Sequence, residues 1–186
     1  MTNLTKPSRN EINYIKSENL LQDAKIIIDT AQDYAYKAVN FALVKRNWLL
    51  GKRIAEEELP GDERAEYGSK IICKLSDELT MLYGKGFDRS TLYKFVRFYK
   101  FFPQIVDSAS PQLERLSWTD FRVLLQVNDE TAGGWYAAEA ATEAWSVKTL
   151  QRNISSQYYY RLLQTTTPDA VKAEMETLTA DYQADK

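Results

Sequence analysis

One short basic stretch holds the residues of this chain whose types and spacing could do recognisable chemistry. Residues 85–100 carry five cations against the single carboxylate of Asp88, a balance of +4 in sixteen positions: Lys85, Arg89, Lys94, Arg97 and Lys100. The whole chain has a net charge of −2 and a pI near 5.4. Cations concentrated in this way attract the phosphate backbone of a nucleic acid. The stretch therefore predicts DNA binding.

Two amphipathic helices must position these cations. Apolar spacing predicts a helix over residues 64–83 and another from Asp88 or Arg89 to about 102, joined by the turn Gly84-Lys85-Gly86. A basic helix after a glycine turn is typical of the recognition helix of a helix-turn-helix. We expect its first residues to reach base edges and its other cations to hold phosphates. The first group is Arg89, Ser90, Thr91 and Lys94, and the second is Lys85, Arg97 and Lys100.

A helical wheel of residues 89–102 separates two faces. One face collects Leu92, Phe95, Val96, Tyr99 and Phe102, and is expected to pack on the preceding helix; the other carries Ser90, Lys94, Arg97 and Phe101. A simpler interpretation stays open, because any amphipathic helix of a bundle has a solvated basic face. The acidic residues 56–66 could pair with such a face.

The remaining pattern predicts an all-α, multi-helix domain that contains an elaborated helix-turn-helix. The other expected helices cover residues 18–58, 117–127, a segment after Asp129 weakened by Gly133-Gly134, and 147–163. We expect residues 1–17 to be a flexible segment and residues 18–163 to form the domain. Residues 164–186 are expected to be a linker followed by an acidic helix or tail that starts at Pro168.

Composition excludes several kinds of site. The chain has no histidine, no phosphate loop of the GxxxxGK[ST] type and no GxGxxG motif, so we expect no cofactor and no bound metal. Cys73 is the only cysteine and is expected to be a half-buried, inert thiol, which suits the cytoplasm. No segment has the length of apolar residues that a membrane span requires. The aromatic residues Trp48, Trp118 and Trp145 are expected in the core.

A series of motifs, in order along the chain, resembles a known family. The matching residues are Asn40, Trp48, Gly51-Lys52-Arg53-Ile54, Glu66-Tyr67-Gly68, Leu75-Ser76, Leu79, Gly84, Gly86-Phe87, Phe98-Tyr99, Leu116-Ser117-Trp118, Leu124-Leu125, Trp145-Ser146-Val147, Leu150, Ile154, Gln157 and Tyr159. Over residues 22–163 the chain is similar to the amino-terminal domain of YhcG-type bacterial proteins, a domain of unknown function associated with nucleases.

The resemblance implies that DNA binding and catalysis belong to different domains. In YhcG-type proteins a helical amino-terminal domain, regarded as DNA-binding, precedes a carboxy-terminal domain of the PD-(D/E)XK nuclease type. Such a site needs clustered carboxylates and a lysine to bind Mg²⁺. The only Asp/Glu-x-Lys triplet here is Asp23-Ala24-Lys25, in a helical pattern. We therefore expect no nuclease activity from this chain, with the nuclease domain only in a longer parent protein or an associated partner.

A second class of function stays open. The long first helix and the helix that contains Tyr158-Tyr159-Tyr160 could mediate homodimerisation or bind another protein, with no direct DNA contact. The two classes are compatible, because many helix-turn-helix proteins bind DNA as dimers.

Overall fold

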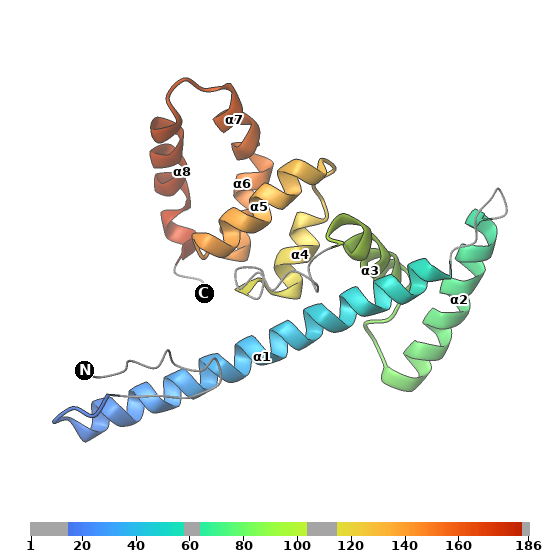
Figure 1. Ribbon diagram of the computed structural model, residues 1–186, viewed down its shortest axis with the longest axis horizontal. Helices are drawn as coiled ribbons and strands as arrows, with labels where there is room; N and C mark the ends of the chain where they lie inside the picture. Colours follow the sequence, from blue (N-terminus) through green and yellow to red (C-terminus); the bar gives the residue numbers. More distant parts are fainter. Residues whose placement is uncertain (1–14, 58–63, 104–114, 184–186) are drawn as a thin grey trace, which may run out of the picture. The chain divides into compact units, whose positions relative to one another are not determined.

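The computed structural model describes residues 15–57, 64–103 and 115–183, and all regular structure in these ranges is helical (Figure 1). The helices are α1 (Leu20–Glu56), α2 (Arg64–Tyr83), α3 (Arg89–Phe101), α4 (Trp118–Leu124), α5 (Glu130–Thr142), α6 (Val147–Ser155), α7 (Tyr158–Gln164) and α8 (Pro168–Gln183). The prediction of an all-α fold is confirmed. Most of the flexible segment predicted over residues 1–17 lies outside the described residues.

The chain divides into two compact units, residues 1–39 and 40–186, with the boundary inside α1. In the first unit a local cap starts the helix. The backbone N–H of Ser17 donates to Asp23 Oδ2 at 2.9 Å, and its hydroxyl donates to Asp23 Oδ1 at 2.6 Å. Asp23 is buried as a result, but apolar side chains of the same helix are exposed, Leu21 by 66% and Ile28 by 54%.

The second unit contains the core. The larger cluster joins the second half of α1 and the end of α3 to α4, α5 and α6, with Phe98, Phe121, Leu124 and Leu150 fully buried. The smaller cluster joins α1, α2 and the start of α3 through Ile54, Ile72, Leu92, Phe95 and Val96. Aromatic edges link the two clusters, because the ring of Trp118 lies 5.3 Å from Phe95 and 5.4 Å from Phe98. The predicted core positions of Trp48 and Trp145 are confirmed.

Short polar caps start the helices of the core. Ser117 and Asp120 form a reciprocal capping box at α4, and Asp129 accepts from the backbone N–H groups of Thr131 and Ala132 at α5. Each cap satisfies backbone donors that the first turn of a helix leaves without partners. The predicted starts of these two helices are confirmed.

The single helix predicted over residues 147–163 is wrong. It breaks at Gln157, whose φ of 55° is left-handed, and continues as α7. A tyrosine from α5 stabilises the break, because the hydroxyl of Tyr136 donates to the carbonyl of Asn153 and accepts from the backbone N–H of Tyr159. These bonds replace ladder bonds that an unbroken helix would make locally. The sequence does not reveal a partner 17 to 23 residues away.

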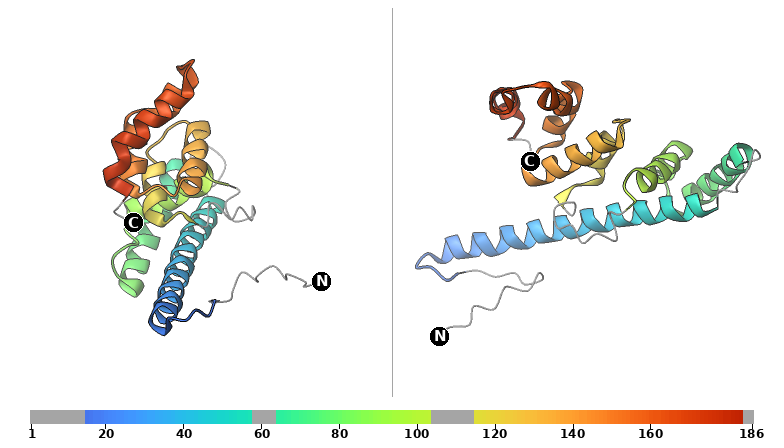
Figure 2. Two further views of the ribbon diagram at one scale, coloured as in Figure 1. Left: turned by 90° about the vertical axis from the view of Figure 1, so that its left-hand side faces the viewer. Right: turned by 45° about the horizontal axis from the view of Figure 1, so that its top comes forward.

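After α7 the chain turns back, and α8 packs against α6 and α7 (Figure 2). Met175 and Thr179 are buried in this contact, and Arg161 of α7 pairs with Glu174 of α8 at 2.5 Å. The segment after Pro168 is therefore a packed helix rather than a frayed tail. The predicted domain boundary near residue 163 stays a prediction.

Candidate nucleic-acid interface

The turn between α2 and α3 needs its two glycines for their backbone conformation. Gly84 has φ of 81° and Gly86 has φ of 116°, values that residues with a side chain adopt only with strain. A Cβ at either position would meet nothing within 4 Å, so space is not the reason. Phe87 then packs against the smaller core cluster, and the guanidinium of Arg46 lies 5.4 Å from the centre of its ring. The start of α3 is thereby anchored.

A backbone contact fixes the middle of α3. A Cβ added at Gly51 of α1 would lie 1.9 Å from the carbonyl oxygen of Phe95, so the two helices cross where only glycine fits. The end of α3 is fixed from the same helix, because the indole Nε1 of Trp48 donates to the carbonyl of Phe102 at 2.9 Å. Trp48 also packs edge-on against Tyr99 at 5.1 Å.

A second glycine, in α5, allows the end of α3 to pack closely. A Cβ at Gly133 of α5 would lie 2.3 Å from Cε1 of Phe101, whereas one at Gly134 would meet nothing within 4 Å. The expectation that Phe101 shares the solvated face with Lys94 and Arg97 is therefore wrong, because its ring is half-buried against α5. Leu82 near the end of α2 is exposed by 66%, although it is apolar.

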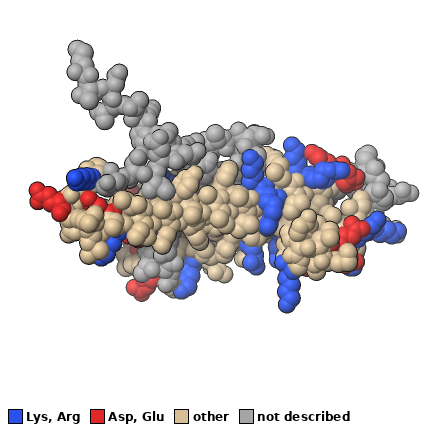
Figure 3. Space-filling view, turned by 90° about the horizontal axis from the view of Figure 1, so that it is seen from below, with Lys and Arg blue, Asp and Glu red and all other residues tan. Residues whose placement is uncertain are grey.

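The predicted site residues lie on the exposed surface of the turn and of α3. Lys85 is in the turn, Arg89 and Ser90 open the helix, and Lys94, Arg97 and Lys100 follow along its side. All six are exposed, and Thr91 is half-buried. The opposite side of α3 is buried through Leu92, Phe95, Val96 and Phe98. Figure 3 shows one face of the molecule, with lysine and arginine side chains on its right-hand half and Asp or Glu side chains among them.

The amino-terminal end of α3 already holds an anion. Asp88 accepts from the backbone N–H of Thr91 at 3.1 Å and from its hydroxyl at 2.6 Å. These hydrogen bonds hold the pKa of the Asp88 carboxyl below its ordinary value of 3.8. A phosphate at this end would compete with a charged carboxylate. The side of the helix is therefore more accessible to phosphate than its end.

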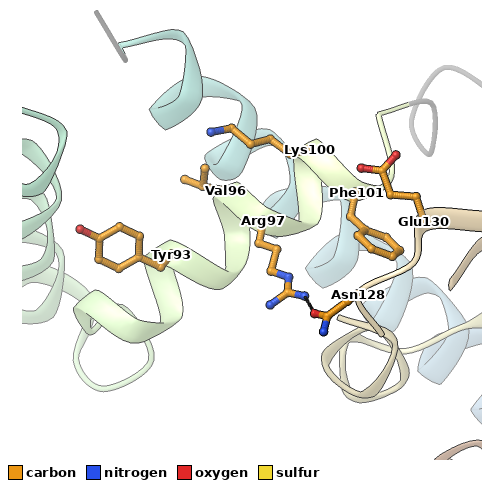
Figure 4. A pocket seen from close by; sticks show the side chains of 7 residues that line it. All are labelled: Tyr93, Val96, Arg97, Lys100, Phe101, Asn128 and Glu130. Atoms are coloured by element: carbon orange, nitrogen blue, oxygen red, sulfur yellow. Dashed lines mark hydrogen bonds between the residues drawn. The ribbon is translucent and has the colours of Figure 1, made fainter. Parts of the chain in front are cut away.

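A groove of about 370 Å³ runs beside Arg97 (Figure 4). Its walls are Tyr93, Val96, Arg97, Lys100 and Phe101 of α3 and, across from them, Asn128 and Glu130 at the start of α5. Arg97 Nη2 donates to Asn128 Oδ1 at 3.2 Å, which orients the guanidinium toward the α4–α5 connection. Two cations and one carboxylate give the groove a positive balance.

Sequence reasoning missed three residues of this groove. Tyr93, exposed by 49%, lies one turn before Arg97 and could have been found from helical spacing alone. Asn128 and Glu130 lie about 30 residues further along the chain, and no local pattern signals that they return to α3.

The three consecutive tyrosines do not form one surface. Tyr158 is buried, and burial together with nearby carboxylates, first Glu139, raises its pKa to about 12. Tyr160 donates to Asp129 Oδ2 at 3.0 Å. This hydrogen bond lowers the pKa of Asp129 and raises that of Tyr160. Tyr160 thereby stabilises the start of α5, next to the residue that binds Arg97.

Among the described residues, no group of three His, Cys, Asp or Glu side chains is placed to hold a metal ion. None of the helices within the described ranges has the length and apolarity that a membrane crossing requires. Cys73 is half-buried, as predicted.

Comparison with known proteins gives two matches. The DUF1016 N-terminal domain matches residues 23–161. A protein of Escherichia coli K12 described as "Putative nuclease YhcG" is 29% identical over 165 residues, which cover 74% of this chain and 44% of that protein. The chain thus aligns with less than half the length of this relative. No solved structure matches the chain. Because the family match covers most of its length, the chain belongs to the DUF1016 N-terminal domain family.

Proposed function

We propose that this chain is a non-catalytic DNA-binding module of a nuclease-associated protein and that it contacts DNA through the exposed side of α3. The observation that carries the proposal is the separation of faces on α3. The cations Lys94, Arg97 and Lys100 are exposed, while the other side of the helix is buried in two core clusters. Exposed cations on a rigidly held helix suit the regular spacing of phosphates.

The geometry favours contacts along the side of α3 rather than at its end. Asp88 and Thr91 bond to each other there, so Arg89 and Ser90 are the residues of the first turn that remain for contacts with bases. Arg97 and Lys100 then face phosphates from the groove wall. The amide of Asn128, which already orients Arg97, is a further polar contact next to them.

The relative adds independent support for a nucleic-acid ligand. Its name describes a nuclease, and such a protein must approach a nucleic acid. We propose that the present chain supplies binding and that catalysis resides in a nuclease domain of a longer parent protein or of an associated partner.

A titration of labelled duplex DNA by fluorescence anisotropy, at several salt concentrations, tests the DNA contact. Lys94→Ala with Arg97→Ala should weaken binding and reduce the log–log salt slope by about 0.9 for each phosphate that the variant no longer neutralises. The matched control is Lys37→Ala with Arg161→Ala, which also removes one lysine and one arginine. Both control cations lie on helices other than α3 and pair with carboxylates. Equal reductions in the two double variants would contradict a specific role for α3.

The proposed lack of catalysis depends on the one Asp/Glu-x-Lys triplet. Asp23 of this triplet is buried and accepts hydrogen bonds from Ser17, so it is committed to starting α1. Incubation of the purified chain with supercoiled plasmid and Mg²⁺ should leave the plasmid intact. Nicking that persists in an Asp23→Asn variant would point to a catalytic site elsewhere in the chain, and nicking that disappears in that variant would point to Asp23.

A further inference from the structure

The first half of α1 exposes an unusual amount of apolar surface. Between residues 20 and 39, eight large apolar side chains are exposed by 36% to 83%: Leu20, Leu21, Ile26, Ile27, Ile28, Tyr34, Tyr36 and Val39. A helix that is apolar around most of its circumference is normally buried. Contiguous exposed apolar surface of this kind marks an interaction site.

The spacing of the small and branched residues defines one stripe on this helix. Leu21, Ala24, Ile28, Ala31, Ala35 and Ala38 follow one another at alternating steps of three and four. This is the a/d repeat of a coiled coil, in which one helix packs on another helix of the same period. Ile27 and Tyr34 flank the stripe on one side, and Lys25 and Gln32 flank it on the other.

The described part of the first unit does not cover this stripe. It consists of the short segment from residue 15 and the helix itself, and a single helix cannot form a core.

We infer that residues 20–39 of α1 pair with the same segment of a second copy of this chain, in an antiparallel coiled coil. The sizes along the stripe fix the direction. With the two-fold axis between Asp29 and Thr30, Leu21 faces Ala38 of the partner subunit and Ile28 faces Ala31 of the partner subunit. Each large side chain thus meets an alanine. The remaining layer pairs Ala24 with the partner's Ala35.

A parallel pairing fits less well. It would place Leu21 on Leu21 of the partner subunit and Ile28 on Ile28 of the partner subunit, with alanine on alanine in the other layers. Wide and narrow layers would then alternate, which leaves voids. The antiparallel pairing also brings no like charges together at its flanks, because Lys25 lies next to Gln32 of the partner subunit. The charges of Asp33 and Lys37 pair within the helix, at 2.5 Å.

This interface does not depend on DNA binding, so it can be tested on the chain alone. Sedimentation velocity between about 1 and about 100 µM should show a monomer–dimer equilibrium. Ile28→Asp should weaken association by about 100-fold or more, because it buries a charge in the seam. Ile26→Asp is the matched control. It replaces the same residue type two positions away, where the side chain points to the opposite side of the helix.

Circular dichroism of both variants separates a defect in association from a defect in folding, and only a folded, monomeric Ile28→Asp chain beside a dimeric Ile26→Asp chain supports the interface. A monomeric parent chain across the whole concentration range would overturn it. So would equal effects of the two substitutions.

Cysteine cross-linking tests the direction of pairing. On a Cys73→Ser background, a mixture of the Leu21→Cys and Ala38→Cys chains should form a mixed disulfide dimer on oxidation, because these positions face each other in the antiparallel pairing. The Leu21→Cys chain alone should remain uncross-linked, since the two positions 21 then lie at opposite ends of the coiled coil. Efficient cross-linking of Leu21→Cys alone would overturn the antiparallel pairing.

Discussion

The two surfaces proposed to be functional differ in how they are supported. α3 buries one side in two core clusters and is contacted at its start, middle and end by α1 and α5. The first half of α1 has no such support within its own unit and exposes apolar side chains instead. A charged surface can thus be supported fully within one chain, whereas exposed apolar surface is typical of an interaction site.

The largest effect on stability is expected for Gly51→Ala, which changes the support of α3. The added methyl group would overlap the carbonyl of Phe95, so α3 must move away from α1. We expect a decrease of about 3 kcal/mol in the free energy of unfolding, at the upper end of overpacking effects. Urea denaturation followed by circular dichroism measures it. An Ala31→Gly chain, changed in the other half of α1, should be destabilised by only about 1 kcal/mol.

Hydrogen exchange compares the two regions directly. In a dilute sample the amides of α3 should exchange at least about 100-fold more slowly than those of residues 20–39, since a helix without packing opens locally. At high concentration the amides of residues 20–39 should gain protection, while those of α3 should not change. Equal protection of both segments in the dilute sample would contradict the proposed difference in packing between α3 and residues 20–39.

Two adjacent glycines of α5 are expected to respond in opposite ways to substitution by alanine. Gly133→Ala should cost about 2 kcal/mol, because its Cβ would overlap the ring of Phe101. Gly134→Ala should instead stabilise the chain by about 0.5 to 1 kcal/mol, because alanine suits a helix better than glycine where nothing is displaced. Thermal unfolding of both variants gives the two signs. A stabilising Gly133→Ala would show that Phe101 does not require close contact with α5.

A small, pH-dependent effect is expected at the cap of α3. Asp88→Ala should lower stability by about 1 kcal/mol at neutral pH. Because folding lowers the pKa of this carboxyl, its contribution is present above the ordinary value of 3.8 and is lost as the pH falls below it. The difference between the two chains should therefore become smaller in denaturation series as the pH is lowered below 3.8. A constant difference at every pH would contradict the cap.

Local chemistry explains which parts of the fold could be predicted. The start of α4 at Trp118 and that of α6 at Val147 follow from capping residues next to them, Ser117 and Ser146. The bounds of α2 and α3 follow from the glycine turn and from Pro103. Such signals lie within a few residues of the boundary that they determine, so a single sequence is enough to find them.

Apart from Tyr93, the main features that sequence reasoning missed depend on distant partners. The break at Gln157 depends on Tyr136, and the placement of Phe101 depends on Gly133. Gly51, a residue type that can mark a bend, lies in an unbroken helix and serves a close approach to Phe95. In the candidate site, the cations are visible as a charge pattern, whereas the role of Asn128 is visible only in three dimensions. Local patterns cannot show which helix crosses which.

The fixed position of α3 also bears on how this family could diversify. The residues that hold the helix, Gly51, Trp48 and Gly133, lie outside it. Its own buried residues lie on one side, and its exposed residues lie on the other. If α3 contacts DNA as proposed, substitutions at positions 89, 90, 93, 94, 97 and 100 would change what the surface recognises at little cost in folding. Selection could retarget the module through a few exposed side chains while its scaffold remains constant.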